Sequence, residues 1–354
     1  MRIAIGTRKG LWTAQGDEQG WTVSQPTRDM AEFASVAWMP RGDGQPPRLL
    51  AGARSWFWGP SVLTSDDDGA TWSDPEHRAI AFAPETETAL ERIWNLTPDP
   101  READVVWAGC EPHSLWRSTD GGASFTLNEG LWEHPHRTQW NPGAGGAAIH
   151  TIVPRRDGSL MVAMSTGGVY TSADSEGGWV ATNRGIRAEF QPDQYPEFNQ
   201  CVHRIAVDAV DEDRVYAQNH GGVFRTLDAG KAWELISQGL PKDFGFVVLA
   251  HPTKAEVAWV IPIDPDTMFP PEGRLRLWRT DDAGSTWHET GAGLPSEHYA
   301  SVMRDAAHVI DHDGEAVIAF GTRNGCVFAS LDGGATFTEV VSGLPDVLSV
   351  RVSA

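Results

Sequence analysis

The chain has 354 residues, of which 40% are hydrophobic, and a formal net charge of −20. This composition supports a large apolar core. The acidic balance argues against nucleic acid or an anionic membrane surface as a partner, because both bind basic patches. No segment approaches the roughly 20 apolar residues that cross a bilayer.

The cysteines and the first residues indicate the compartment. Cys110, Cys201 and Cys326 are far apart and form no CxxC pair, which is typical of reduced thiols rather than of a disulfide framework. The segment MRIAIGTRKGLW contains too short an apolar run for a secretory leader and is predicted to form a strand. We therefore expect a cytoplasmic protein.

An eight-residue pattern recurs along the chain: Ser or Thr, any residue, Asp, any residue, Gly, any residue, a small residue and an aromatic residue. Five copies match closely, namely SDDDGATW, STDGGASF, TLDAGKAW, TDDAGSTW and SLDGGATF. A degraded copy, SADSEGGW, starts at residue 172 and a weak one at residue 13. The copies start at residues 13, 65, 118, 172, 226, 280 and 330, so their spacing stays between 50 and 54 residues. Such regular spacing indicates a repeat architecture.

The pattern has a physical interpretation as the turn of a β-hairpin. The Asp carboxylate accepts backbone N–H groups of the turn, and Gly supplies a positive φ. The terminal Trp or Phe packs beneath the turn, between neighbouring repeats. We therefore predict a structural role, without a catalytic one, for the five motif aspartates, which are Asp67, Asp120, Asp228, Asp282 and Asp332.

In chain order, the first repeat supplies three strand-like segments, at residues 2–7, 10–14 and 20–23. The fifth repeat shows a full set of four, at residues 201–208, 214–218, 222–227 and 232–236. A spare strand, residues 348–353, follows the last repeat and is predicted to complete the first blade beside residues 2–6. The fold class is therefore all-β. We predict a seven-bladed β-propeller of four-stranded antiparallel blades, one domain over residues 1–354, with the ring closed by the C-terminal strand.

The five motifs resemble those of the Asp-box (BNR) repeat propellers, which include sialidases, sortilin-type receptors and photosystem assembly factors. The resemblance covers the whole chain and implies a sialidase-like scaffold of the bacterial type often labelled glycosyl hydrolase. Sialidases, however, have six blades, an arginine triad, a Tyr–Glu nucleophile pair and an early Arg-Ile-Pro motif. This chain lacks Arg-Ile-Pro and has only four tyrosines, two of them in predicted strands. A typical sialidase is therefore not expected.

Loop length predicts which face of the propeller carries the function. The connections at residues 73–92, 128–148 and 182–200 are each about twenty residues long, and loops of this length are usually functional. They leave the same face as the hairpin loops at residues 54–60 and 263–273. The Asp-box turns lie on the opposite face.

Aligning the inner strands of the third, fourth and fifth blades places Trp94, His150 and His203 at one level of the central channel. We therefore predict a pocket at the channel mouth. Cys201 is expected to point away from it and to pack between strands. The candidate catalytic residues are His150, His203, Glu111, Glu197 and Asp305. The candidate ligand-binding residues are Trp56, Trp94, Trp140, His113, Asn219, His220, Arg304 and Arg54.

Three functions remain open on this reading. Aromatic rings that stack on sugars, together with carboxylates and histidines for acid/base work, favour a small polar or sugar-like ligand and a hydrolase or lyase. No motif requires a cofactor, but a transition metal is compatible with His150, His203 and His220. The segment SWFWG at residues 55–59 also suits a protein partner bound through the loop face.

Overall fold

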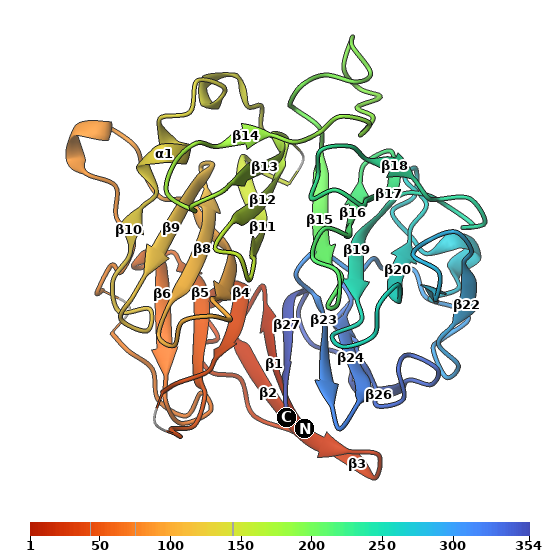
Figure 1. The fold of residues 1–354 in the computed structure, drawn as a ribbon. Coiled ribbons are helices and arrows are strands. Elements are labelled where there is room, and N and C mark those ends of the chain that lie inside the picture. Colours follow the sequence, from red (N-terminus) through yellow and green to blue (C-terminus); the bar gives the residue numbers. More distant parts are fainter. Residues whose placement is uncertain (43, 75, 144) are drawn as a thin grey trace.

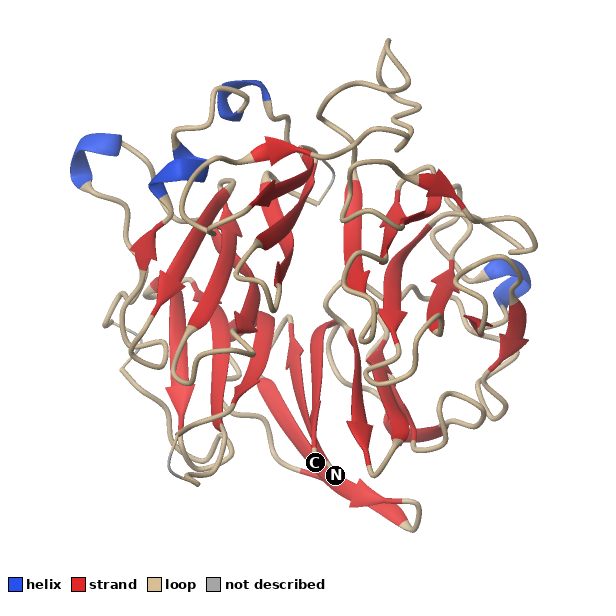
Figure 2. Cartoon of the chain, in the orientation of Figure 1, coloured by secondary structure: helices blue, strands red, loops and turns tan. Residues whose placement is uncertain are grey.

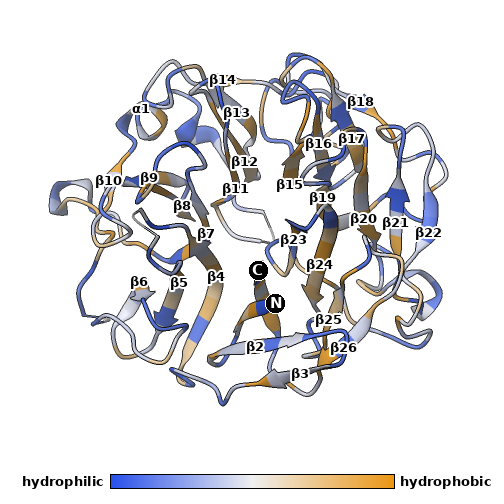
Figure 3. Cartoon of the chain, turned by 60° about the horizontal axis from the view of Figure 1, so that its bottom comes forward, coloured by the Kyte–Doolittle hydropathy of each residue, from blue (hydrophilic) through white to orange (hydrophobic). Residues whose placement is uncertain are grey.

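The computed structural model describes residues 1–42, 44–74, 76–143 and 145–354. Over these residues the chain forms seven antiparallel sheets that surround a central axis, as the ring of blades in Figure 3 shows. Strands dominate, and short helices lie in the connections (Figure 2). The predicted seven-bladed β-propeller is confirmed.

The innermost strands contact one another in sequence around the axis, and each sheet extends outward from there (Figure 1). From the axis outward, the first blade consists of β27 (Val347–Ser353), β1 (Arg2–Thr7), β2 (Leu11–Asp17) and β3 (Gly20–Val23), the second of β4 (Ala31–Met39), β5 (Arg48–Ser55) and β6 (Gly59–Ser65), and the third of β7 (Arg92–Pro98), β8 (Val106–Glu111), β9 (Ser114–Ser118) and β10 (Thr126–Leu127). The fourth blade consists of β11 (Ala148–Pro154), β12 (Leu160–Ser165), β13 (Gly168–Ser172) and β14 (Val180–Ala181), and the fifth of β15 (Val202–Val207), β16 (Val215–Asn219), β17 (Gly222–Thr226) and β18 (Glu234–Leu235). The sixth blade consists of β19 (Gly245–Ala250), β20 (Ala258–Pro262), β21 (Leu277–Thr280) and β22 (His288–Thr290), and the seventh of β23 (Ala307–His312), β24 (Glu315–Gly321), β25 (Val327–Ser330) and β26 (Thr338–Val341).

The C-terminal strand closes the ring as predicted. β27 pairs antiparallel with β1, from Arg2 opposite Ser353 to Gly6 opposite Ser349. The two chain ends consequently lie side by side at the bottom of the molecule (Figure 1). Val350 and Val352 of β27 are buried in the same apolar cluster as Ile3 and Ile5 of β1, so the closing strand is part of the core.

The second sheet has three strands in the described part of the chain, where four were expected. Beyond β6, the N–H of Ser73 donates to the Thr64 carbonyl at 2.9 Å. The Ser73 hydroxyl accepts the N–H of Thr64 at 3.0 Å, in place of a backbone carbonyl. A side chain thus replaces the next backbone partner, and ladder pairing ends there.

The Asp-box turns adopt the geometry that the pattern predicts. In the first close copy, Asp67 accepts the N–H of Thr71 at 2.8 Å, the hydroxyl of Thr71 at 2.6 Å and the hydroxyl of Ser65 at 2.8 Å. Gly69 has a φ of +90°, a conformation that favours glycine. The indole N–H of Trp72 donates to the Gly69 carbonyl at 3.0 Å. The bond from the backbone N–H four residues later recurs at the other four motif aspartates.

The long connections gather at the end of the propeller opposite the chain ends (Figure 1). They contain helix α1 (Glu129–Trp132) and 3-10 helices at Pro84–Thr86, Arg137–Gln139 and Pro271–Gly273. The Asn128 side chain caps α1 by accepting the N–H of Leu131 at 2.9 Å. In the described residues, no helix is long and apolar enough to span a membrane.

Candidate functional site

The innermost strands bulge where they approach the loop end of the channel. In five of them, the pairing with the neighbouring strand skips one residue. A bulge re-aims the side chain of the extra residue and is common beside active sites. The skipped residues are Ala34 in β4, Trp94 in β7, His150 in β11, His203 in β15 and Leu348 in β27.

All five bulge residues border cavities at the channel mouth. Ala34, Trp94, His150 and Leu348 line a cavity of about 270 Å³, here called the charged cavity. His203 lines a neighbouring cavity of about 730 Å³, here called the His203 cavity. The two share the side chains of Met303, Arg304 and Arg323 along with Gly145. The bulges therefore build one composite site with two compartments.

Three arginines of the charged cavity form ion pairs with two carboxylates. Arg8 lies 3.0 Å and Arg92 lies 2.8 Å from Glu32. Arg323 lies 3.0 Å from Asp346. These pairs join side chains from different blades, so they fix the wall of the cavity rather than offer a free charge to a ligand.

Arg304, which both compartments share, differs from these arginines. Its side chain forms no ion pair with any described residue, yet the residue is only 7% exposed. The guanidinium lies over the Phe246 ring, 4.8 Å from the centroid. Burial lowers the pKa of Arg304 to about 10, so the side chain is still a cation at neutral pH.

Glu111 is the complementary charge in the charged cavity. Its carboxylate accepts the indole N–H of Trp94 at 2.9 Å and the N–H of Ala147 at 3.3 Å, and within the described residues no cation pairs with it. The Gly145–Gly146 segment packs against both free charges. A Cβ on Gly145 would lie 2.6 Å from Arg304 Nη2, and one on Gly146 would lie 2.5 Å from Glu111 Oε1.

His150 is a neutral imidazole on the floor of the charged cavity. Its ring meets the Trp94 ring edge to face, with 4.9 Å between centroids. Burial, with a smaller effect of the nearby Arg304 cation, holds the pKa of His150 well below its usual value. Its Nε2 atom has no hydrogen-bond partner in the described part of the chain.

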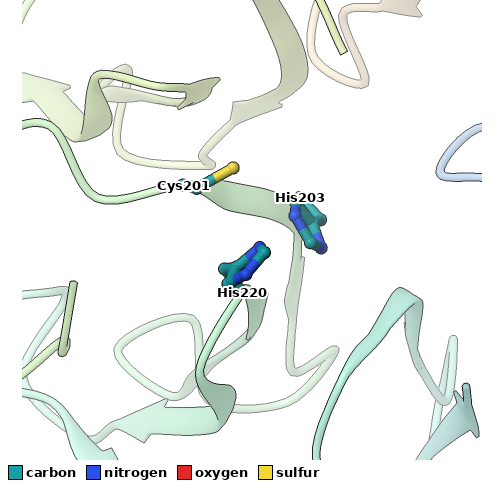
Figure 4. Close-up of side chains that lie close together, drawn as sticks. All are labelled: Cys201, His203 and His220. Carbon is teal, nitrogen blue, oxygen red and sulfur yellow. The ribbon is translucent and has the colours of Figure 1, made fainter. Parts of the chain in front are cut away.

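The His203 cavity contains a cysteine and two histidines (Figure 4). Cys201, His203 and His220 each offer one potential ligand atom, and these three atoms lie within 4.8 Å of one another. The expectation that Cys201 points away is wrong. Cys201, directly before β15, lines the same cavity as His203. Gln200 is instead buried and donates to the Pro196 carbonyl at 2.6 Å.

Three predicted aromatic residues do not border either cavity. Trp56 is 99% exposed at the turn between β5 and β6. Trp140 is buried in the core of the fourth blade and donates its indole N–H to the Tyr170 hydroxyl at 2.9 Å. His113 is buried beside Trp140, with 5.3 Å between ring centroids. The loops thus use these rings for packing or leave them on the surface.

The remaining predicted polar residues are engaged elsewhere. Arg54 pairs at the surface with Glu91 at 3.6 Å, and Glu197 is exposed outside both cavities. Asn219 is buried and donates to the Arg187 carbonyl at 2.9 Å. Asp305 borders the charged cavity, but its carboxylate is held by Arg351 at 2.5 Å.

Several lining residues carry no signal that sequence reasoning could use. Glu32, Arg92 and Asp346 meet at the cavity because strands from separate blades converge there. Their only hint in the sequence is a position at, or just before, an inner strand. The placement of Cys201 beside His203 carries no such signal either, because the bulge at His203 interrupts the alternation along this strand.

No protein-family model matches this chain. It is 25% identical to a xyloglucanase of Hypocrea jecorina over 331 residues, which cover 82% of this chain but only 37% of that enzyme. Among solved structures, it is similar to YCF48 bound to a D1 peptide, with a TM-score of 0.53, 14% identity and coverage of 96% and 83% of the two chains. It is also similar to an ancestral GH74 enzyme, with a TM-score of 0.53, 13% identity and coverage of 95% and 39%. The chain is therefore a seven-bladed propeller with a relative among the glycoside hydrolases, and it spans about a third of that relative's length.

Proposed function

We propose that this protein binds a small, acid-bearing, sugar-like molecule in the charged cavity, with Arg304 receiving the acid group. One observation carries the proposal: a buried guanidinium faces the cavity without a carboxylate partner in the described residues. Leaving a buried charge unpaired costs several kcal/mol. A carboxylate or phosphate that accepts two parallel N–H bonds from Arg304 would remove that cost.

The charges deeper in the channel support an anionic ligand. Arg204 donates to the carbonyls of Arg304 and Ala307, and burial lowers the pKa of Arg204 to about 10. Arg351 is paired with Asp305. In the part of the channel that they line, Arg204, Arg304 and Arg351 thus stand against one carboxylate, Asp305, so this part is positive although the whole chain carries −20. A field of this sign draws an anion inward.

The other walls of the charged cavity suit the sugar-like part of such a ligand. Trp94 offers a half-buried ring for stacking, and the free Glu111 carboxylate accepts hydroxyl groups. Glu111 and neutral His150 are also candidate proton acceptors, as a hydrolase or lyase needs for its general base. The weak similarity to a xyloglucanase supports a glycan substrate. The volume of about 270 Å³ favours a small sugar over an extended polysaccharide.

The test is isothermal titration calorimetry with glucuronate, gluconate and glucose 6-phosphate, with glucose and a xyloglucan oligosaccharide as neutral probes. At least one acidic probe is expected to bind and the neutral ones are not. Arg304→Met should weaken the binding by roughly 100-fold, because two charge-assisted hydrogen bonds are lost.

The matched control is Arg8→Met, which removes a guanidinium from the same cavity. Glu32 keeps Arg92 as partner, and Asp346 keeps Arg323, so the affinity for the acidic probe should change by less than about 3-fold, as for a charge at a binding-site rim. Equal binding of neutral and acidic probes, or an unchanged affinity in Arg304→Met, would overturn the proposal.

A protein partner is the second candidate function, and one surface feature favours it. Met30, Trp56 and Phe57 are 66%, 99% and 79% exposed. Ala31, which follows Met30, pairs with Ser55, so the three apolar side chains lie at the same end of the second blade. Exposed aromatic clusters of this kind are typical of protein contacts. The absence of binding to every small probe would favour this candidate.

We also propose a cytoplasmic location. Cys110, Cys201 and Cys326 are all free thiols in the structure. Cytosolic proteins keep cysteines reduced, whereas secreted proteins usually pair them.

A further inference from the structure

We propose that Cys201, His203 and His220 form a binding site for a transition metal of the zinc type, which opens into the His203 cavity. The site differs from the set of three histidines that the sequence suggested, because Cys201 takes the place of His150. It is separate from the anion receptor proposed above, since Arg304 is not a ligand of the metal.

The hydrogen bonds of His203 prepare it for metal binding. Its Nδ1 lies 2.6 Å from the Gly245 carbonyl. Because a carbonyl only accepts, Nδ1 carries the proton and Nε2 keeps its lone pair. Metal-binding histidines usually have this arrangement, in which the second ring nitrogen donates to a carbonyl or carboxylate.

Cys201 and His220 are held next to each other by the backbone. The N–H of His220, directly after β16, donates to the Cys201 carbonyl, directly before β15, at 3.0 Å. Cys201 is only 7% exposed, and its sulfur lies 3.1 Å from the Ser165 hydroxyl. Burial raises the pKa of the Cys201 thiol, and this hydroxyl and the nearby Arg304 cation offset only part of that effect. A metal would supply the further stabilisation that the thiolate needs.

The donor set selects the kind of metal. One thiolate and two imidazoles suit zinc or copper, whereas magnesium and calcium require oxygen ligands. Three protein ligands leave a fourth position open, as in catalytic rather than structural zinc sites. That position would face the His203 cavity, where Phe244 and Phe246 form an apolar wall. A water or ligand group could therefore reach the metal from the same compartment.

The present separations describe a site that must tighten on binding. Ligand atoms around tetrahedral zinc lie about 3.5 Å apart, given bonds of roughly 2.0 to 2.3 Å. The three atoms here lie within 4.8 Å of one another. Cys201 and His203 are buried, whereas His220 is exposed. His220 is therefore the side chain free to move inward by the remaining ångström or so.

Two other histidines are adjacent but unsuitable. The ring centroids of His134 and His136 lie 4.6 Å apart. His134 contacts the Trp179 carbonyl at 3.2 Å, and His136 contacts the Tyr170 hydroxyl at 2.9 Å. In the described residues, they do not belong to a group of three possible ligands. This pair provides an internal control.

The experiment is a titration of the metal-free full-length protein with Co²⁺, which replaces zinc and reports its ligands in the absorption spectrum. We expect one Co²⁺ per chain and a thiolate-to-cobalt charge-transfer band. Zn²⁺ should displace the cobalt and bleach the band. The melting temperature should rise with Zn²⁺, because the metal binds the folded chain alone.

Variants identify the ligands. Cys201→Ser should abolish the charge-transfer band. His203→Ala and His220→Ala should each weaken Co²⁺ binding by more than about 100-fold, since loss of a mere supporting hydrogen bond already costs up to that much. Cys326→Ser and His134→Gln should leave band and affinity unchanged. Circular dichroism and a thermal melt without metal establish that each variant folds.

Several outcomes would overturn the proposal: no stoichiometric binding, binding without a charge-transfer band, or equal binding by wild type and Cys201→Ser. Arg304→Met removes the anion receptor but no metal ligand, so it should still bind one Co²⁺. Loss of sugar-acid binding in that variant would therefore leave the metal site standing, and failure of the metal titration would leave the anion proposal standing.

Discussion

At the scale of single residues, buried histidines make the stability of this fold depend on pH. His113, His150 and His308 all have pKa values below the usual one, because burial disfavours the charged ring. For His113 the pKa falls to about 4. In the unfolded chain the same rings take up a proton near pH 6.5.

We therefore predict that the protein loses stability as the pH falls from about 6.5 to 4. In this range these histidines bind protons in the unfolded chain but stay neutral in the folded one, so protonation favours unfolding. The difference of about 2.5 pKa units at His113 corresponds to at most about 3 kcal/mol. Urea denaturation at a series of pH values measures the slope. His113→Gln should make that slope shallower by up to one proton, and an identical slope would contradict the assignment.

At the scale of elements, each Asp-box turn is a local device that holds one hairpin. In the sixth blade, Asp282 accepts the N–H of Thr286 at 2.8 Å and the hydroxyls of Thr286 and Thr280 at 2.7 and 2.8 Å. These hydrogen bonds lower the pKa of Asp282, the side-chain bond from Thr286 most. Neither Asp282 nor its bonding partners border the charged cavity or the His203 cavity.

Asp282→Ala should lower the free energy of unfolding by about 1 kcal/mol or more, because it leaves backbone and hydroxyl donors without partners. The affinity for the acidic probe should not change. Asp281→Ala is the matched control: its carboxylate is half exposed and pairs with Arg279 at the surface, where such pairs contribute little. Chemical denaturation together with calorimetry checks both statements. A loss of ligand affinity without a loss of stability would refute the structural role.

At the scale of the whole molecule, stability depends on joining the two chain ends. β27 contributes an innermost strand to the blade that β1 to β3 otherwise form alone. Its side chains are largely buried, and Arg351 of this strand pairs with Asp305, just before the neighbouring inner strand β23. Leu348, its bulge residue, lines the charged cavity. The closing strand therefore supports both the ring and the site.

Deleting residues 348–354 should destabilise the protein by several kcal/mol, because it strips an inner strand from the core and exposes the edge of β1. Binding of the acidic probe should be lost as well. Deletion of Ala354 alone, which is exposed, serves as the control. A truncated protein with an unchanged thermal melt would show that the ring does not depend on this strand.

The sequence by itself determined the seven blades, the Asp-box turns and the closing strand. These features rest on short-range chemistry. Asp67 bonds to Thr71 only four residues away, and the repeat spacing counts hairpins without reference to their packing. The closing strand followed from counting as well, since the first repeat lacked one strand and the last had one to spare.

Only the tertiary structure decided the site. Trp94, His150 and His203 reach the channel through bulges. A bulge depends on the register between two strands, and the pattern of apolar and polar residues along a single strand does not reveal it. Whether Arg304 has an ion-pair partner depends on which carboxylates the other blades bring near it. Trp56 and Trp140 are the same residue type in two loops, but Trp56 is exposed whereas Trp140 is buried. Such features arise from contacts between distant segments, which residue type and spacing do not encode.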